Sequence, residues 1–216
     1  MDLALFIPFL LVSVVVHEVA HAWQALREGD RTAEAAGRIT LNPLPHLDLW
    51  GSFLIPALLF VGGGVMFGWA KPVPVDPRNF RHHPWSDIRV SLAGIVANLA
   101  LAALFTLMAA GAAWLGGALP AWRSVAELIR GGLYYGIFIN LILAVFNLIP
   151  IPPLDGSHVV FHMLPTRLRP AYRRLGGVGL IVLMGLVFFL PNLLGLLLTP
   201  VTYLMGFADT FIRSWL

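Results

Sequence analysis

VVVHEVAHAW, residues 14–23, places two histidines and a glutamate at the end of an almost wholly apolar run. On a helix, His17 and His21 lie on the same face about one turn apart, so both imidazoles can bind one cation. Glu18 completes the H-E-x-x-H pattern of zinc sites, in which the glutamate handles the proton of a bound water. Each histidine could instead satisfy only a local hydrogen bond, but ionisable groups at membrane depth are costly and normally mark a functional site. The stretch therefore predicts a membrane helix that carries part of a metal site.

The composition is that of an integral membrane protein. Of 216 residues, 58% are hydrophobic and 12% are charged, which is about half the charged fraction of a soluble domain. A helix needs about 20 apolar residues to cross a bilayer, and long apolar stretches cover residues 1–26, 51–70, 90–119, 131–154 and 175–207. Pro191 and Asn192 divide the last stretch into two short spans. We expect an all-α polytopic membrane protein with about six transmembrane helices, in which residues 51–65 either cross fully or turn back as a re-entrant segment.

One membrane-embedded domain is expected over residues 1–216, with a catalytic core at about 1–160 and accessory helices at about 175–213. The first apolar run lacks a basic start and an A-x-A-like exit, so we expect no cleaved signal peptide. The chain has no cysteine, which excludes disulfides and thiolate metal sites. The net charge of +3 comes from loop Arg and Lys and indicates topology and lipid head-group contact, not nucleic-acid binding. If all six helices cross, the charge distribution places the N-terminus in the cytoplasm.

Two proline-rich segments cannot form regular helices. KPVPV, residues 71–75, has alternating prolines and predicts a short extended or β segment near residues 69–76. This segment is either a plain turn or a free edge to which an unwound substrate adds as a strand. The second segment predicts a broken backbone near residues 150–156. Irregular backbone in an apolar segment is tolerated only where it lines a cavity or packs against protein.

A catalytic zinc site needs three protein ligands and keeps a fourth position for water. Asp155 is the leading candidate for the third ligand, because it is the only acid between Glu127 and Asp209 and lies in the broken segment. The alternative role for Asp155 is a helix N-cap, and His158 is a rival ligand three residues further on. One Zn²⁺ per chain is expected on the two histidines and one of these two residues.

Two asparagines in apolar spans, Asn98 and Asn147, need hydrogen-bond partners to be tolerated there. For Asn98 we favour interhelical hydrogen bonding, worth about 0.6–2 kcal/mol. Asn147 lies beside the broken backbone, which favours a role near the substrate, since a side-chain amide can donate to a developing oxyanion. His82 and His83 are interpreted as a solvated or head-group-facing stretch.

HEVAH together with FNLIPIPPLDG, residues 146–156, resembles the site-2 protease family of intramembrane zinc metalloproteases, peptidase family M50. GRITLNPLPHLD, GSFLIP and FGWAKPVPV are also similar to the short branch of that family, which lacks PDZ and CBS domains. The resemblance runs from about His17 to His158. One departure is AGIVAN, residues 93–98, where Ile95 replaces the proline of the A-G-P-x-x-N pattern found in many relatives, so we expect no proline kink at this position.

The resemblance also implies roles and a function. Carried onto the matching positions, it implies zinc ligands at His17, His21 and Asp155, a general base at Glu18, and substrate positioning or oxyanion stabilisation at Asn147. It implies an endopeptidase that hydrolyses peptide bonds within or next to transmembrane segments of membrane proteins such as anti-sigma factors or signal-peptide remnants. The expected location is the prokaryotic cytoplasmic membrane, with several spans. The expected partners are transmembrane protein substrates and the lipid bilayer, together with a regulatory membrane protein or a second copy of the chain.

Two other functions fit part of the pattern. A metal transporter could use intramembrane His and Asp groups as a cation site, but transporters usually have repeated halves, and the chain has one HExxH and one PPLDG. A non-catalytic membrane scaffold of the same fold is expected to lose Glu18 or a ligand, and all are present. The sequence therefore favours the protease.

Overall fold

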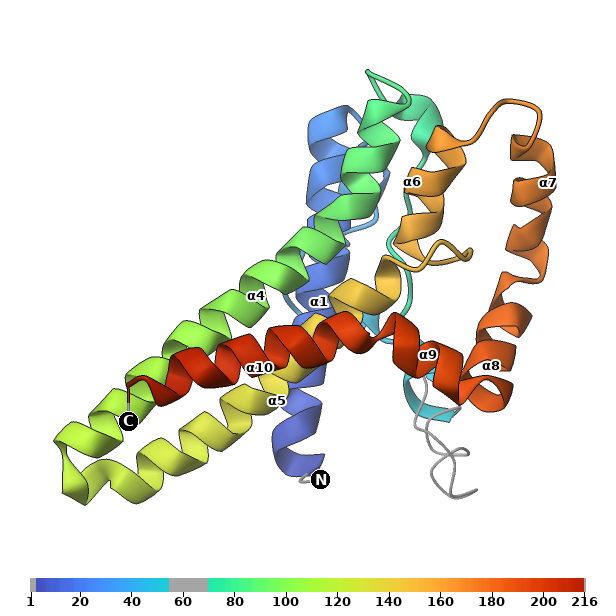
Figure 1. Ribbon diagram of the computed structural model, residues 1–216. Helices are drawn as coiled ribbons and strands as arrows, with labels where there is room; N and C mark the ends of the chain where they lie inside the picture. The colour runs from blue at the N-terminus through green and yellow to red at the C-terminus, as the bar shows by residue number, and fades with distance from the viewer. Residues whose placement is uncertain (1–2, 55–69, 216) are drawn as a thin grey trace.

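Three long helices form the centre of the computed structural model, which describes residues 3–54 and 70–215. They are α1 (Leu3–Glu28), α4 (Trp85–Ala118) and α5 (Arg123–Asn147). α4 and α5 run antiparallel, joined by the short helix η4 (Pro120–Trp122), and α1 packs against both (Figure 1). The spans Ala4–Glu28, Trp85–Ala118 and Pro120–Asn147 are each long and apolar enough to cross a membrane.

The remaining elements are shorter. Between α1 and α4 lie α2 (Thr32–Ala35), η1 (Leu44–His46), η2 (Leu49–Leu54) and η3 (Pro77–Asn79). After α5 follow α6 (Asp155–Met163), α7 (Arg169–Arg174), η5 (Leu175–Gly177), α8 (Gly179–Phe189), α9 (Pro191–Leu197) and α10 (Thr199–Arg213). α6 lies beside the first turns of α4, whereas α10 crosses α4 and α5 (Figure 1).

Small side chains let the long helices approach closely. Ala102, Ala109 and Ala113 of α4 are buried in one cluster with Ile137 of α5 and Ile212 of α10. In lipid, van der Waals packing drives helix association because lipid tails are as apolar as the side chains themselves. The alanines of α4 therefore provide the surface on which α5 and α10 pack.

The count of candidate spans covers only the described part of the chain, so it does not test the expected six. Within the described residues three helices qualify singly, and the count rises to five if each of two bent pairs forms one span. The pairs are Arg169–Gly177 with Gly179–Phe189, bent by 70°, and Pro191–Leu197 with Thr199–Arg213, bent by 48°. Residues 55–65 of the expected second span lie outside the described residues. The all-α class agrees with the structure.

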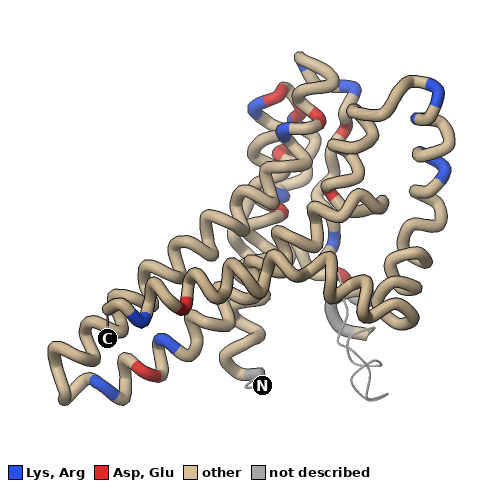
Figure 2. The backbone as a smooth tube through the Cα atoms, in the orientation of Figure 1, with Lys and Arg blue, Asp and Glu red and all other residues tan. Residues whose placement is uncertain are grey.

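Charged residues gather toward the ends of the long helices, and much of the backbone between them carries none (Figure 2). The apolar middle exposes large side chains, among them Leu107, Ile181, Phe189 and Phe207. Exposed apolar surface of this extent is unusual for a soluble monomer, and it suits contact with lipid. The structure is accordingly that of a membrane protein.

The expected β segment near residues 69–76 is wrong, because the described part, residues 70–76, forms no strand. Alternating prolines remove two N–H donors from this segment. The amides of Lys71, Val73 and Asp76 donate to the His46 carbonyl (2.9 Å), Glu18 Oε2 (2.8 Å) and Asp30 Oδ2 (2.7 Å). Side chains and a loop carbonyl thus take these donors, so a neighbouring strand cannot pair with them.

The predicted break in the backbone near residues 150–156 is present, since α5 ends at Asn147 and α6 begins at Asp155. Gly156 packs directly on the Leu148 carbonyl, and a Cβ at this position would overlap that group. Gly179 makes a similar close approach to the Pro152 carbonyl. The two glycines therefore allow the irregular segment to pack between α5, α6 and α8.

Candidate metal centre

The three predicted ligands converge from two helices distant in the sequence. His17 and His21 lie on one face of α1, and Asp155 is the first residue of α6. Asp155 Oδ2 lies 3.3 Å from His17 Nε2 and 3.3 Å from His21 Nε2, and the two Nε2 atoms are 3.0 Å apart. The side chains are 10%, 12% and 19% exposed. This triangle of donor atoms is largely shielded from the surroundings.

The triangle fits a tetrahedral ion. Ligand atoms about 2.0–2.1 Å from a tetrahedral zinc lie about 3.3 Å from one another, close to the distances observed here. Asp155 Oδ2 is buried and has no hydrogen-bond partner among the described residues. Two imidazoles and a carboxylate also form a donor set common in catalytic zinc sites.

Hydrogen bonds fix the orientation of both imidazoles. His21 Nδ1 donates to the Val90 carbonyl (2.7 Å), an atom that can only accept. His17 Nδ1 donates to Asn98 Oδ1 (2.6 Å), since the Asn98 amide nitrogen itself donates to Asn140 Oδ1 (2.7 Å). With protons on both Nδ1 atoms, the neutral rings direct two Nε2 lone pairs toward each other and toward a carboxylate. A cation between the two Nε2 atoms and Asp155 Oδ2 would remove the repulsion between these lone pairs and the carboxylate.

A buried polar network extends from this contact to the helix backbones. Asn98 and Asn140 are both fully buried. Asn140 Nδ2 donates to the Gly136 carbonyl (2.8 Å) and to Ser13 Oγ (2.7 Å), and Ser13 Oγ donates to the Phe9 carbonyl (2.6 Å). The network therefore orients the His17 ring with groups from α1, α4 and α5.

Gly94 gives the two imidazoles their space. It lies on α4 directly against the rings, and a Cβ at this position would overlap His21 Nε2 and the Cε1 and Nδ1 atoms of His17. Only glycine lacks a Cβ. The close approach of α4 to α1 thus depends on this residue.

All five predicted site residues line one cavity of about 540 Å³. The cavity walls come from α1, the segment 70–77, the start of α4, the end of α5, the α5–α6 connection, α6 and α8. Glu18 Oε2 accepts a hydrogen bond from the Val73 amide (2.8 Å), and Asn147 Nδ2 donates to the Leu143 carbonyl (2.9 Å). The arrangement places a carboxylate and an amide in the cavity that holds the donor triangle.

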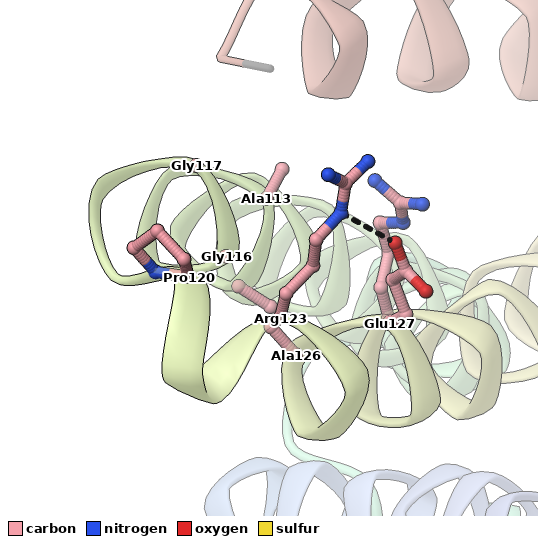
Figure 3. A pocket seen from close by; sticks show the side chains of 9 residues that line it. Ala113, Gly116, Gly117, Pro120, Arg123, Ala126 and Glu127 are labelled. Carbon is pink, nitrogen blue, oxygen red and sulfur yellow. Dashed lines mark hydrogen bonds and ion pairs between the residues drawn. The ribbon is translucent and has the colours of Figure 1, made fainter.

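A second hollow, of about 360 Å³, lies at the turn between α4 and α5 (Figure 3). Arg123 and Glu127 line this hollow from α5, and Arg123 Nε donates to Glu127 Oε1 at 3.2 Å. Its described lining residues include none of the five predicted ones. It is therefore separate from the candidate metal centre.

Sequence reasoning missed part of the site. Asn98 was interpreted as an interhelical contact, which it makes, but it also binds His17. Gly94 and Val90 were not identified, since their roles depend on how α4 packs on α1. His158 lines the cavity but lies 3.5 Å from Asp87 and outside the donor triangle. Asn140, a polar residue in an apolar helix like Asn98, was a further signal of the network that the sequence offered.

Comparisons with known proteins agree with this chemistry. The family model for peptidase family M50 matches residues 5–131 and 119–190. YwhC of Bacillus subtilis, whose assigned name describes it as a zinc metalloprotease, is 39% identical to this chain over 194 residues. The matched region covers 88% of this chain and 82% of YwhC.

The Rip2 proteins carry the same functional description. Rip2 of Mycolicibacterium smegmatis is 35% identical over 68% of this chain and 52% of its own length. Rip2 of Mycobacterium tuberculosis is 32% identical over 76% of this chain and 57% of its own length. The matched region thus spans little more than half of either Rip2 protein. No solved structure matches significantly. The chain therefore belongs to peptidase family M50 and is a metalloprotease.

Proposed function

We propose that the protein is an intramembrane zinc endopeptidase, which hydrolyses peptide bonds within or next to the transmembrane segments of other membrane proteins. The observation that carries the proposal is the donor triangle of His17, His21 and Asp155, which shares one cavity with Glu18. Two corners of the triangle belong to a helix apolar enough to cross a membrane. A site in such a helix is accessible to substrates that are themselves in the bilayer.

His17, His21 and Asp155 are the residues that would hold zinc. When bound, zinc lowers the pKa of a water ligand and polarises a carbonyl oxygen. The hydrogen bonds from His17 to Asn98 and from His21 to Val90 orient both rings for this role, and such supporting contacts typically change metal affinity by about 10–100-fold.

Glu18 is proposed as the general base. It accepts a proton from the attacking water and passes it to the leaving amine, a role suited to a carboxylate beside the ligands. Oε2 already accepts the Val73 amide, so we assign proton transfer to Oε1. Asn147 is proposed to turn from the Leu143 carbonyl and donate to the developing oxyanion, an interaction whose loss typically costs about 10²–10³ in rate.

The proposed setting is the prokaryotic cytoplasmic membrane, with the chain crossing it several times. The exposed apolar surface and the charge at the helix ends support this placement. A substrate helix hides its peptide bonds in internal hydrogen bonds, so it has to unwind locally before a carbonyl enters the cavity. Single-span membrane proteins and signal-peptide remnants are the proposed substrates, and a regulatory membrane protein or a second copy of the chain is the proposed partner.

The test compares wild-type protein with Glu18→Gln in proteoliposomes that contain a single-span reporter substrate. Glu18→Gln should retain zinc and lose about 10²-fold or more in cleavage rate, because the substituted amide cannot accept the proton. Glu127→Gln is the matched control, since its carboxylate is 54% exposed and lies at the separate hollow. Undiminished cleavage by Glu18→Gln, or a wild type that binds no zinc, would refute the proposal. If the wild-type protein cleaved an unfolded soluble protein as fast as the single-span reporter, the proposal that it acts on substrates in the membrane would be refuted.

A further inference from the structure

A second cluster of metal-binding side chains lies where the end of α6 meets the start of α4 (Figure 1). His83 precedes α4, Asp87 is in its first turn, and His162 is in the last turn of α6. Each residue offers one ligand atom, and these three atoms lie within 4.8 Å of one another. The protease reaction proposed above uses none of the three.

Asp87 is at the centre of this cluster. Its Oδ2 atom lies 2.6 Å from His162 Nε2 and 3.5 Å from His158 Nδ1. The Asp87 side chain is 11% exposed and that of His162 is 4% exposed. His83 is exposed, and its ring meets the His162 ring edge-on with centroids 5.2 Å apart. Three imidazoles therefore surround one carboxylate, and two of them lie on one face of α6 because they are four residues apart.

Hydrogen bonding alone accounts for this arrangement poorly. His162 Nδ1 is buried and has no hydrogen-bond partner among the described residues. The nearby Arg89 pairs with Glu28, at 3.3 Å, and no ion pair between Arg89 and Asp87 occurs in the described structure. A buried carboxylate is costly unless an opposite charge compensates it. The imidazoles of His158 and His162 supply that charge only when they are protonated, whereas a bound cation supplies it with both rings neutral.

We propose that His83, Asp87 and His162 bind a second divalent transition-metal ion, with His158 as an adjacent fourth donor. Imidazole nitrogens with one carboxylate suit zinc and its neighbours in the first transition row, and not magnesium or calcium, which prefer oxygen ligands. The donor set resembles that of the first site in chemistry, but it lies at the helix ends. His83 is exposed, so this proposal adds a ligand role to the sequence interpretation of a solvated or head-group-facing stretch.

The second ion would also act on the first site. α6 begins with Asp155 and carries His162 seven residues later, about 10 Å along the helix. Asp87 and His158 line the cavity that holds the donor triangle. An ion bound to Asp87 and His162 ties α6 to α4 and so holds the helix from which Asp155 projects. The role is that of a positioning site.

The test uses the full chain in detergent with the first site disabled by His17→Asn and Asp155→Asn. This variant should still bind one zinc ion in a titration with elemental analysis, and Co²⁺ in its place should give the absorption of nitrogen and oxygen ligation. Adding His83→Asn should abolish this binding. His83 is exposed, so its replacement leaves the buried Asp87–His162 contact and the fold in place. Adding His82→Asn, at the neighbouring position outside the cluster, is the matched control and should retain the ion.

The outcomes separate the two sites. The second site is refuted if the first-site variant, with wild-type helix content by circular dichroism, binds no ion. It is also refuted if the first-site variant still binds an ion after His83→Asn is added, and likewise after Asp87→Asn is added in a separate variant. Different results would refute the protease proposal. They are a wild-type protein that binds an ion only at the second site, or reporter cleavage that Glu18→Gln does not slow.

Discussion

At the scale of single residues, Asn98 links a metal ligand to the helix packing. Its amide accepts from His17 and donates to Asn140 and to the Ser13 carbonyl, so it contacts two other helices. Because His17 and Asn98 are 81 positions apart, the sequence could predict that Asn98 needs a partner but not which one. The H-E-x-x-H spacing, by contrast, is local and predicted the relation of His17 to His21 directly.

Asn98→Ala should weaken zinc binding at the first site by about 10–100-fold, because His17 loses the group that fixes its tautomer and ring orientation. The measurement is a competition titration against a chelator of known affinity. Thr106→Ala on the same helix is the control, since the Thr106 hydroxyl bonds only to the Ala102 carbonyl in the described structure. An unchanged zinc affinity would show that the ligand triangle does not depend on this contact.

Gly94→Ala should abolish zinc binding at the first site, since the added methyl group overlaps the imidazoles of His17 and His21. To make room, the rings must break their hydrogen bonds to Asn98 and Val90, or α1 and α4 must separate. Overpacking of this kind typically costs about 1–3 kcal/mol of stability. Gly111→Ala on the same helix is the control, because a Cβ there meets nothing within 4 Å. Zinc content and thermal unfolding of both variants check the prediction. Full zinc occupancy in Gly94→Ala would contradict the close approach of the two helices.

At the scale of elements, the segment after residue 70 is held by side chains and not by a sheet. Prolines in KPVPV correctly excluded a helix, but the strand prediction failed because its amides bond to acceptors elsewhere in the chain. Asp30 is one such acceptor. Its carboxylate accepts from the Asp76 amide (2.7 Å) and from Asn79 Nδ2 (2.8 Å). Sequence alone could not predict these bonds, which join residues 46 and 49 positions apart.

Acid should release this segment. Burial raises the pKa of Asp30, but the hydrogen bonds from Thr32, Asn79 and Asp76 outweigh it and lower the pKa below the ordinary value of 3.8. A carboxyl whose pKa is lower in the folded state stabilises the fold above about pH 4, and that stabilisation is lost as the pH falls through the folded pKa. Asp30→Asn should therefore cost about 1–3 kcal/mol at neutral pH, and the difference from wild type should shrink below about pH 4.

Thermal unfolding of wild type and Asp30→Asn between pH 7 and pH 3 measures this difference. Glu34→Gln is the control, because Glu34 is 42% exposed and pairs only with Arg31 in the described structure. A difference from wild type that stays constant across the pH range would show that the Asp30 charge does not stabilise the segment.

At the scale of the whole molecule, apolar run length predicted the three long helices well. Their packing and the bends in the C-terminal third could not be predicted, because composition does not specify where a chain bends or which faces meet. The second cluster shows the same limit. His83 and Asp87 are close in the sequence, but His162 joins them only because α6 returns beside α4 after the break at residues 148–154.

The cavity is lined by α8 as well as by the segments that carry the motifs, so we expect substrate access to depend on α8. Leu183 of α8 is 2% exposed and lines the same cavity as the predicted ligands on α1 and α6. Leu183→Trp should fill part of the roughly 540 Å³ cavity and lower the rate of reporter cleavage while zinc content stays unchanged. Ile181→Trp is the matched control on the same helix, because Ile181 is 70% exposed. If Leu183→Trp cleaved at the wild-type rate, the substrate would have to reach Glu18 by a route that avoids α8.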